Sequence, residues 1–228
     1  MGKINIITNQ QEVFADRKQA AEMLNVQVEK YKDSENLIVL GIPRGGVILA
    51  DKLARYLNGG LDIMLTRKIR APHNPELAVG AVSEEGKLYL NQSIVTTLGL
   101  SEEYINTEKN RQLNEIKRRK ELYREVLEKA SLSGKVVILT DDGVATGATM
   151  QAAIWAAAAE FPEKLIIALP VAPPDTLEKL AKDVDETICL CAPSNFLSIS
   201  QFYTYFEQVA DEQVVEVLKN YSKANTHG

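Results

Sequence analysis

Five short runs of apolar residues, each followed by a turn, constrain the fold of this chain more than any other feature. Between them lie segments with helical spacing of apolar residues, at about 46–58, 148–160 and 174–182. Near-continuous apolar runs that alternate with helices are typical of a parallel sheet covered on both faces. We therefore predict a doubly wound α/β fold with a mainly parallel, five-stranded sheet and helices on both faces. The five runs are 37–42 (LIVLGI), 61–66 (LDIMLT), 136–140 (VVILT), 165–171 (LIIALPV) and 187–191 (TICLC).

Three segments fall outside this alternation. We expect a helix over 11–32, a loop with a short hairpin over 69–95, and a long helix over 101–129 with Ser101 as its N-cap. The sequence contains no internal repeat, low-complexity segment or linker rich in proline, glycine or serine. We therefore predict a single domain over residues 1–228.

Composition and charge narrow the functional classes. Of the 228 residues, 45% are hydrophobic and 25% are charged, which is typical of a globular domain and not of a disordered or fibrous chain. The net charge of −5 disfavours a broad nucleic-acid-binding surface. No apolar run approaches the roughly 20 residues of a membrane span. The first residues also lack the apolar segment of a signal peptide, so we expect a cytoplasmic protein without a membrane partner.

Cysteine and histidine are too scarce for the common transition-metal sites. Cys189 and Cys191 share one face of a predicted strand, as a reduced and buried pair would. His73 and His227 are the only histidines of the chain, which disfavours a histidine-rich metal site or a catalytic triad.

The long helix over 101–129 is rich in charge. We interpret its basic residues as a solvated face that the acidic residues of the same helix balance, with nucleic-acid binding as the alternative. The basic residues are Arg111, Lys117, Arg118, Arg119, Lys120 and Arg124, and the acidic residues are Glu108, Glu115, Glu121, Glu125 and Glu128.

The end of the run 136–140 joins two features that favour ligand groups of different kinds. Asp141 and Asp142 follow the run directly, and the sequence TGAT at 146–149 then opens a predicted helix. A helix start rich in glycine and threonine binds anions through its amides and hydroxyls, whereas carboxylates accept hydrogen bonds from vicinal hydroxyls. A pentose with a 5-phosphate and a free 2,3-diol satisfies both features. We predict that it binds in the crevice beyond the strand ends, with a corner that carries incidental acids as the alternative.

A second strand end is rich in glycine. The sequence GIPRGGV at 41–47 places Gly45 and Gly46 in a tight turn with an exposed backbone, and Arg44 adds a positive charge. This turn could hold a second phosphate group, with a plain strand-to-helix turn as the alternative.

A third strand end is cationic. Arg67, Lys68 and Arg70 cluster there, and no acid follows before Glu76. A cationic strand end that faces the same crevice could neutralise a departing pyrophosphate, with a scattered surface cluster as the alternative.

Together these motifs resemble those of the type I phosphoribosyltransferases. The stretch VVILTDDGVATGATM resembles the family's signature for phosphoribosyl pyrophosphate (PRPP), GIPRGG resembles its pyrophosphate loop, and TRK resembles the basic start of its flexible catalytic loop. The stretches FADR, GIPRGGV, RKIRAPHNPELAVGAV and DDGVATGAT resemble most closely a branch of stand-alone bacterial and archaeal members that are assigned by similarity alone. This resemblance spans nearly the whole chain.

The resemblance implies a Mg²⁺-dependent pentosyltransferase that displaces pyrophosphate from C1 of PRPP with a nitrogen nucleophile, such as a nucleobase. Asp141 and Asp142 would hold the diol and meet the Mg²⁺ through water. The expected catalytic residues are Asp141, Asp142, Arg67 and Lys68. The expected pyrophosphate contacts are Arg44, Gly45 and Gly46. The expected 5-phosphate contacts are Gly143, Val144, Ala145, Thr146, Gly147, Ala148 and Thr149.

Two positions depart from the family pattern. Ala145 stands where enzymes that act on 6-oxopurines usually carry an acid, which argues against hypoxanthine or guanine as the acceptor. Gly143 stands where the family prefers an aliphatic residue, and it could loosen the loop.

The resemblance further implies a homodimer, a variable hood that binds the acceptor, and a flexible lid. The expected hood segments are about 1–35, 96–130 and 192–228, and the expected lid is 69–95. Aromatic residues of the last hood segment are candidates for stacking on a flat acceptor, with membership of the hydrophobic core as the alternative. These aromatic residues are Phe196, Phe202, Tyr203, Tyr205 and Phe206.

Two other functions share parts of the same motifs. A non-catalytic sensor of PRPP or a nucleotide would keep the acid pair and the phosphate loop, but it would not need Arg67, Lys68 or a long lid. A kinase that synthesises PRPP resembles the acid-pair motif, but it has two comparable domains in a longer chain. We therefore favour the transferase.

Overall fold

The computed structural model of the protein describes residues 2–225, and Met1 and residues 226–228, which include His227, lie outside that part. Its main sheet has six parallel strands in the order β1-β9-β8-β7-β2-β3. These strands are β1 (Lys3–Thr8), β2 (Leu37–Gly41), β3 (Gly60–Ile63), β7 (Val136–Thr140), β8 (Lys164–Val171) and β9 (Glu186–Cys191).

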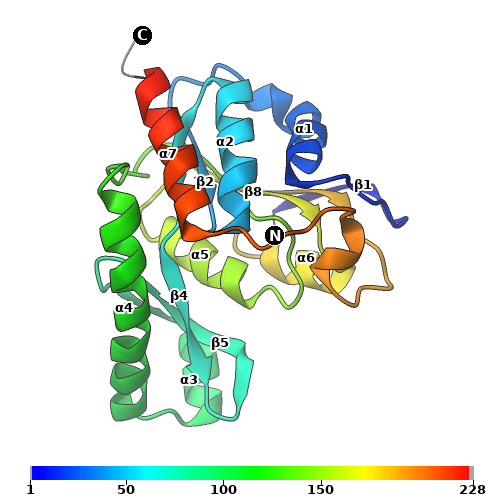
Figure 1. Cartoon of the computed structure of the whole chain (residues 1–228). Helices are drawn as coiled ribbons and strands as arrows, with labels where there is room; N and C mark the ends of the chain where they lie inside the picture. Colours follow the sequence, from blue (N-terminus) through cyan, green and yellow to red (C-terminus); the bar gives the residue numbers. More distant parts are fainter. Residues whose placement is uncertain (1, 226–228) are drawn as a thin grey trace.

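Helices cover both faces of this sheet (Figure 1). One face packs with α1, α2 and α7 around Val39 and Ile138, and the other packs with α5 and α6 around Leu40 and Leu139. Successive residues of a strand point to opposite faces, which is why the runs of the buried strands are apolar throughout. The predicted fold class is therefore confirmed. These helices are α1 (Arg17–Val28), α2 (Gly45–Leu57), α5 (Ala148–Ala158), α6 (Pro174–Leu180) and α7 (Asp211–Asn225).

The sheet has one strand more than the five that we predicted, and the additional strand is β1. It lies at the edge of the sheet beside β9, and most of its side chains are half-buried or exposed. An edge strand needs less apolar surface than a central one, so the sequence KINIIT contains no continuous apolar run that would reveal it.

The order of the strands reverses between β2 and β7, which are paired in the middle of the sheet. From β2 the chain continues through α2 to β3 on one side, and from β7 it continues through α5 to β8 on the other. In open parallel sheets, ligands bind beyond the carboxyl ends of the strands at such a reversal. The residues that follow Gly41 and Thr140 lie at this edge.

A second sheet, with strands β4-β5-β6, extends with α3 and α4 toward the bottom of Figure 1. We predicted a loop with one short hairpin over 69–95. The hairpin β5–β6 is present, but residues expected as loop form β4 and most of β5, whose side chains Ile69 and Val79 pack with Ile116 of α4. The run 61–66 divides between β3 and β4. The elements are β4 (Thr66–Ala71), β5 (Asn74–Ser83), β6 (Leu88–Leu90), α3 (Gln92–Leu98) and α4 (Glu102–Arg124).

Side-chain caps fix the starts of the two helices that we expected outside the alternation. The carboxylate of Asp16 accepts hydrogen bonds from the amides of Lys18 and Gln19 at 2.9 and 3.0 Å, so α1 begins later than predicted. The hydroxyl of Ser101 accepts a hydrogen bond from the amide of Tyr104 at 3.2 Å, which confirms Ser101 as the N-cap of α4.

Residues 199–209, which we name the C-terminal strap, lead from a short helix at Ile199–Phe202 toward α7. The amide of Phe14 donates to the carbonyl of Phe202, and the amide of Thr204 donates to the carbonyl of Phe14, both at 2.8 Å. The strap is thereby joined to the chain just before α1. Among the helices of residues 2–225, none is long and apolar enough to cross a membrane. The single-domain organisation and the hood segments stay predictions.

Candidate active site

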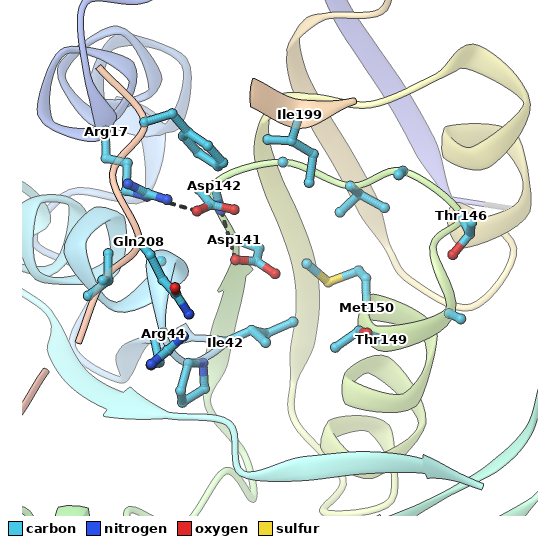
Figure 2. A pocket seen from close by; sticks show the side chains of 18 of the residues that line it. Arg17, Ile42, Arg44, Asp141, Asp142, Thr146, Thr149, Met150, Ile199 and Gln208 are labelled. Atoms are coloured by element: carbon cyan, nitrogen blue, oxygen red, sulfur yellow. Dashed lines mark hydrogen bonds and ion pairs between the residues drawn. The ribbon is translucent and has the colours of Figure 1, made fainter. Parts of the chain in front are cut away.

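The two acids at the end of β7 lie at the reversal of strand order. Asp141 and Asp142 follow Thr140, the last residue of a fully paired central strand. The carboxylate of Asp141 accepts a hydrogen bond from the amide of Asp142 at 2.9 Å, which turns the first carboxylate back along its own chain. Both acids border the same cavity (Figure 2).

Hydrogen bonds to neighbouring segments of the chain fix the loop between these acids and α5. The amide of Val144 donates to the carbonyl of Val171 at 2.9 Å, and the hydroxyl of Thr176 donates to the carbonyl of Ala145 at 2.8 Å. Gly147 has a φ of 80° and precedes the first residue of α5. This left-handed conformation favours glycine, and it turns the chain so that the first amides of α5 are free to meet an anion.

The turn after β2 reaches the acids from the neighbouring strand. A Cβ atom on Gly45 would lie 1.9 Å from Oδ2 of Asp142, and one on Gly46 would lie 2.7 Å from the carbonyl oxygen of Thr140. Gly46 is therefore required by close approach to the backbone at the end of β7, and Gly45 leaves room for the Asp142 carboxylate. The peptide bond between Pro43 and Arg44 is cis.

One cavity of about 650 Å³ brings most of the predicted site residues together. Arg44, Gly45, Arg67, Asp141, Asp142 and all of residues 143–149 line it. Gly46 is buried behind the turn, and Lys68 lines a smaller adjoining cavity of about 80 Å³ that shares Arg67 with the first. The sequence motifs therefore converge in space, although their individual roles stay predictions.

The cationic residues after β3 lie on β4 and not on a loop. Lys68 forms an ion pair with Glu76 on the opposite strand of the hairpin, with 3.3 Å between Nζ and Oε2. The same Oε2 atom accepts a hydrogen bond from the hydroxyl of Thr146 at 3.1 Å. The β4–β5 hairpin thus contacts the predicted phosphate loop. His73 is exposed at the tip of this hairpin.

Arg119 lines both cavities, and the sequence interpretation missed it. We had assigned it to a solvated face of the long helix, but it lies on the buried stripe of α4 that includes Gln112, Ile116 and Tyr123. The signal was present in the spacing, because a residue three positions after Ile116 shares its face. The interpretation as a solvated face holds for Lys117, which is exposed. It is wrong for Glu108, which is buried, and for Arg124, whose side chain is 11% exposed and forms ion pairs with Asp62 and Glu84.

Positive charge is not fully compensated at this end of the cavity. Burial lowers the pKa of Arg67, and the charges of Arg119 and Arg70 lower it further, despite the opposing charge of Glu115. Within residues 2–225 no ion pair is formed by Arg119, Arg70 or Arg44. Unpaired guanidinium groups that are half-buried form a site for an anion.

Burial raises the pKa of both acids. It raises the pKa of Asp141 well above the ordinary value, and the neighbouring charge of Asp142 raises it further. Burial also raises the pKa of Asp142, although the charge of Arg17 opposes that shift. A carboxylate pair that resists carrying two charges is stabilised by hydroxyl donors or by a cation.

Most of the aromatic candidates belong to the hydrophobic core or pack against it. Of the five, Phe206 alone lines this cavity, but its ring already stacks with Tyr203 at 4.8 Å and lies 4.0 Å from the guanidinium of Arg17. Phe202 is fully buried, and Tyr205 is exposed outside the cavity. The apolar part of the lining comes instead from Ile42, Val144, Met150 and Ile199.

Comparison with known proteins agrees with this geometry. A family model described as a phosphoribosyl transferase domain matches residues 4–207. The chain belongs to the phosphoribosyl transferase family. The resemblance that we drew from the acid-pair and glycine motifs is therefore confirmed at the level of the family.

Relatives of this phosphoribosyl transferase domain include a solved structure and two curated proteins. The crystal structure of TT1426 from Thermus thermophilus is 40% identical, with a TM-score of 0.86, and the match covers 92% of this chain and 99% of that one. Two Mycobacterium tuberculosis proteins that are provisionally named phosphoribosyl transferases, MT0597 and Rv0571c, are 36% identical over 206 residues. The match covers 90% of this chain and 46% of theirs, so the chain spans about half the length of these curated relatives.

Proposed function

We propose that this domain is a Mg²⁺-dependent phosphoribosyltransferase that displaces pyrophosphate from C1 of PRPP with a nitrogen nucleophile, such as a nucleobase. The observation that supports this proposal most directly is the shared cavity at the reversal of strand order. There, two carboxylates and the start of α5 face one space of about 650 Å³. A ligand with hydroxyls alone would use only the carboxylates, and a simple anion would use only the helix start. A ribose 5-phosphate group can use both.

The sugar and its phosphate would bind at opposite ends of the 141–149 segment. Asp141 and Asp142 would accept hydrogen bonds from the 2,3-diol, which suits carboxylates that burial makes reluctant to carry two charges. The amides at the start of α5 and the hydroxyls of Thr146 and Thr149 would hold the 5-phosphate. Fixing the sugar at both ends positions C1 for attack.

The pyrophosphate would lie toward β4 and α4. Arg44, Arg67 and Arg119 line that part of the cavity, and Arg44 and Arg119 form no ion pair within residues 2–225. Charge that develops on the departing pyrophosphate would meet preorganised guanidinium groups. Lys68 lines the smaller adjoining cavity and not the main one, so we propose a secondary role for it.

The carboxylates of Asp141 and Asp142 are hard oxygen ligands of the kind that Mg²⁺ prefers. Within residues 2–225, no group of three or more histidine, cysteine, aspartate and glutamate side chains could hold a metal by itself. The pair fits a metal that keeps several waters and takes its other oxygens from phosphate groups. Bound Mg²⁺ would neutralise charge on the pyrophosphate.

The β4–β5 hairpin is the segment that we propose as the lid. It contacts the phosphate loop through Glu76 and Thr146, and it carries Arg67 into the cavity. Closing this edge would exclude water, which would otherwise attack the reacting sugar carbon. We also propose a homodimer in the cytoplasm, by analogy with the family; sedimentation that gives a monomer mass would contradict the dimer.

A base panel tests the proposed function. The protein is incubated with PRPP, Mg²⁺ and each of a set of nucleobases, and pyrophosphate release is measured. We expect release with at least one base, and a loss of about a hundredfold in the double variant Asp141→Asn/Asp142→Asn. The matched control is Asp175→Asn, an exposed acid in the first turn of α6.

Other results would contradict the enzyme or the role of the acid pair. Tight PRPP binding without turnover on any base would favour the non-catalytic sensor. No PRPP binding at all, or unchanged turnover in the double variant, would remove the acid pair from the function.

A further inference from the structure

The segment FADR at 14–17 has no place in the proposed reaction, yet the structure gives each part of it a definite contact. Phe14 is 1% exposed and lies 5.4 Å from the ring of Tyr203 in the C-terminal strap. Asp16 caps α1, which leaves Arg17 as the first residue of that helix. The position of Arg17 is therefore set from both sides, by the strap and by the helix cap.

Arg17 makes three contacts at the edge of the cavity, and Figure 2 marks the one to Asp142. Its Nε donates to Oδ2 of Asp142 at 2.8 Å, and its Nη1 donates to the carbonyl oxygen of Glu207 at 2.9 Å. Its guanidinium carbon lies 4.0 Å from the centre of the Phe206 ring. The side chains of Arg17 and Asp142 are 12% and 13% exposed, so solvent screens this ion pair less than an exposed one.

Asp142 is enclosed on its other sides as well. The hydroxyl of Tyr203 donates to the backbone carbonyl of Asp142 at 2.6 Å. The Cα atom of Gly45 lies against Oδ2, since a Cβ atom there would be 1.9 Å from it. Arg17 and Gly45 thus meet the same carboxylate oxygen, Oδ2, and Asp142 itself lines the cavity.

We propose that Arg17 is a positioning residue: it fixes the Asp142 carboxylate through Oδ2 so that Oδ1 is directed at the sugar diol. This inference rests on the proposed function and adds a role for a residue outside the three strand-end motifs. A lone buried carboxylate would turn toward any available donor, so its orientation must come from a partner. Arg17 supplies a directional donor, and Phe206 and Glu207 hold the guanidinium plane.

The planar fork of arginine, and not its charge alone, is what this role requires. Arg17 donates through two different nitrogens to Asp142 and to the strap. A lysine at this position would keep the positive charge but would offer a single nitrogen on a flexible chain. Arg17→Lys therefore separates the electrostatic contribution from the geometric one.

The test measures the affinities for ribose 5-phosphate, inorganic phosphate and inorganic pyrophosphate by calorimetric titration. In Arg17→Lys we expect the affinity for ribose 5-phosphate to fall about tenfold, as for a lost hydrogen bond to a charged group, while the affinity for inorganic phosphate stays within about twofold. Arg17→Gln should lose at least as much ribose 5-phosphate affinity. Thermal unfolding of each variant confirms that it is folded before titration.

The matched control is Arg55→Gln. Arg55 also donates through Nε to an aspartate at 2.8 Å and also lies over an aromatic ring, Tyr221 at 5.3 Å, but its side chain is 39% exposed on the surface of α2. Losing this pair should leave both affinities unchanged. An effect equal to that of Arg17→Lys would show that removing any such arginine perturbs binding, and it would overturn the proposal.

Other outcomes decide the proposal as well. Equal losses for ribose 5-phosphate and inorganic phosphate would show a merely structural role. An unchanged ribose 5-phosphate affinity in Arg17→Lys would show that positive charge at this position is sufficient, and it would overturn the positioning role. A loss confined to inorganic pyrophosphate would place Arg17 on the leaving group instead. If the unmodified protein and Arg17→Lys bind ribose 5-phosphate equally well, this inference fails but the proposed function does not. If the unmodified protein binds no ribose 5-phosphate, the proposed function fails as well.

Discussion

The carboxylate of Glu76, on the β4–β5 hairpin, accepts a hydrogen bond from the hydroxyl of Thr146 in the phosphate loop, 3.1 Å away. This contact places a negative charge beside the loop that we propose for the 5-phosphate. Lys68 and Thr146 together hold the pKa of Glu76 below its ordinary value, so the group is charged at neutral pH. A bound phosphate must therefore tolerate or displace it.

Replacing Glu76 should strengthen phosphate binding. In Glu76→Gln we expect the affinity for inorganic phosphate to rise about two- to fivefold, because one repelling charge is lost, and this gain should shrink at high salt. Calorimetric titration at two salt concentrations measures both effects. Glu178→Gln, an exposed change on α6, is the control. A weaker affinity in Glu76→Gln would mean that Glu76 orders the loop for its ligand.

Arg119 should matter for pyrophosphate more than for phosphate. In Arg119→Gln we expect the affinity for inorganic pyrophosphate to fall about tenfold, since a half-buried guanidinium that forms no ion pair within residues 2–225 is lost. The affinity for ribose 5-phosphate should change much less. Lys117→Gln removes an exposed charge from the same helix and controls for the overall field. Equal effects of the two changes would show that Arg119 acts only through the overall charge of α4 and not by direct contact with pyrophosphate.

Gly143 should be required by the C-terminal strap. A Cβ atom at this position would lie 2.7 Å from Cγ2 of Ile199 and 3.0 Å from Cγ1 of Val171. Gly143→Ala should therefore reduce the free energy of unfolding by about 1–3 kcal/mol, as overpacking does, measured by urea denaturation. In Gly143→Ala/Ile199→Ala the loss should be less than the sum of the single losses. Additive losses would show that the two positions do not meet.

Glu186 should make stability depend on acidic pH. Burial acts to raise its pKa, but hydrogen bonds from Lys30 and Tyr31 and the charges of Lys30 and Lys164 outweigh it and hold the pKa below the ordinary 4.5. A carboxyl whose pKa is lowered by folding stabilises the protein above its unfolded pKa, and this contribution is lost as the pH falls through the folded value. In Glu186→Gln the loss of stability should therefore be largest near neutral pH.

The measurement for Glu186 is thermal unfolding of both proteins between pH 7 and pH 3. The two curves should converge as the pH falls below about 4.5, where the carboxyl of the unfolded chain takes up its proton. A constant difference across the whole range would show that the side chain contributes by packing alone. Glu178→Gln, exposed on α6, should follow the unmodified protein throughout.

The central strands and the acid-pair loop could be predicted because they are encoded locally. A strand buried on both faces must be apolar throughout, and a loop such as 143–149 needs glycine where the chain turns left-handed or approaches another strand. The edge strand β1 and the strands β4 and β5 have no such signal, because each is partly exposed or packs against α4 far along the sequence.

Arg17 could not be assigned from the sequence, and Arg119 was missed although its spacing from Ile116 gave a signal. Arg17 lies 125 residues before its partner Asp142, and nothing in its neighbours indicates that the two meet. Arg119 stands among basic residues on a helix that is mostly exposed, so its orientation depends on which stripe of α4 is buried. Local patterns identify a strand end; the residues that surround it come from tertiary packing.

The join between the strap and Phe14 has a consequence for how the domain forms during synthesis. All six strands of the main sheet are complete once Cys191 has been made. Tyr203, which donates to Asp142, and the Glu207 carbonyl, which accepts from Arg17, are added only afterwards. A nascent chain that stops at 195 would contain the six strands but would lack part of the proposed sugar-binding site. Competence to take up a ribose phosphate would thus be among the last properties that the growing polypeptide acquires.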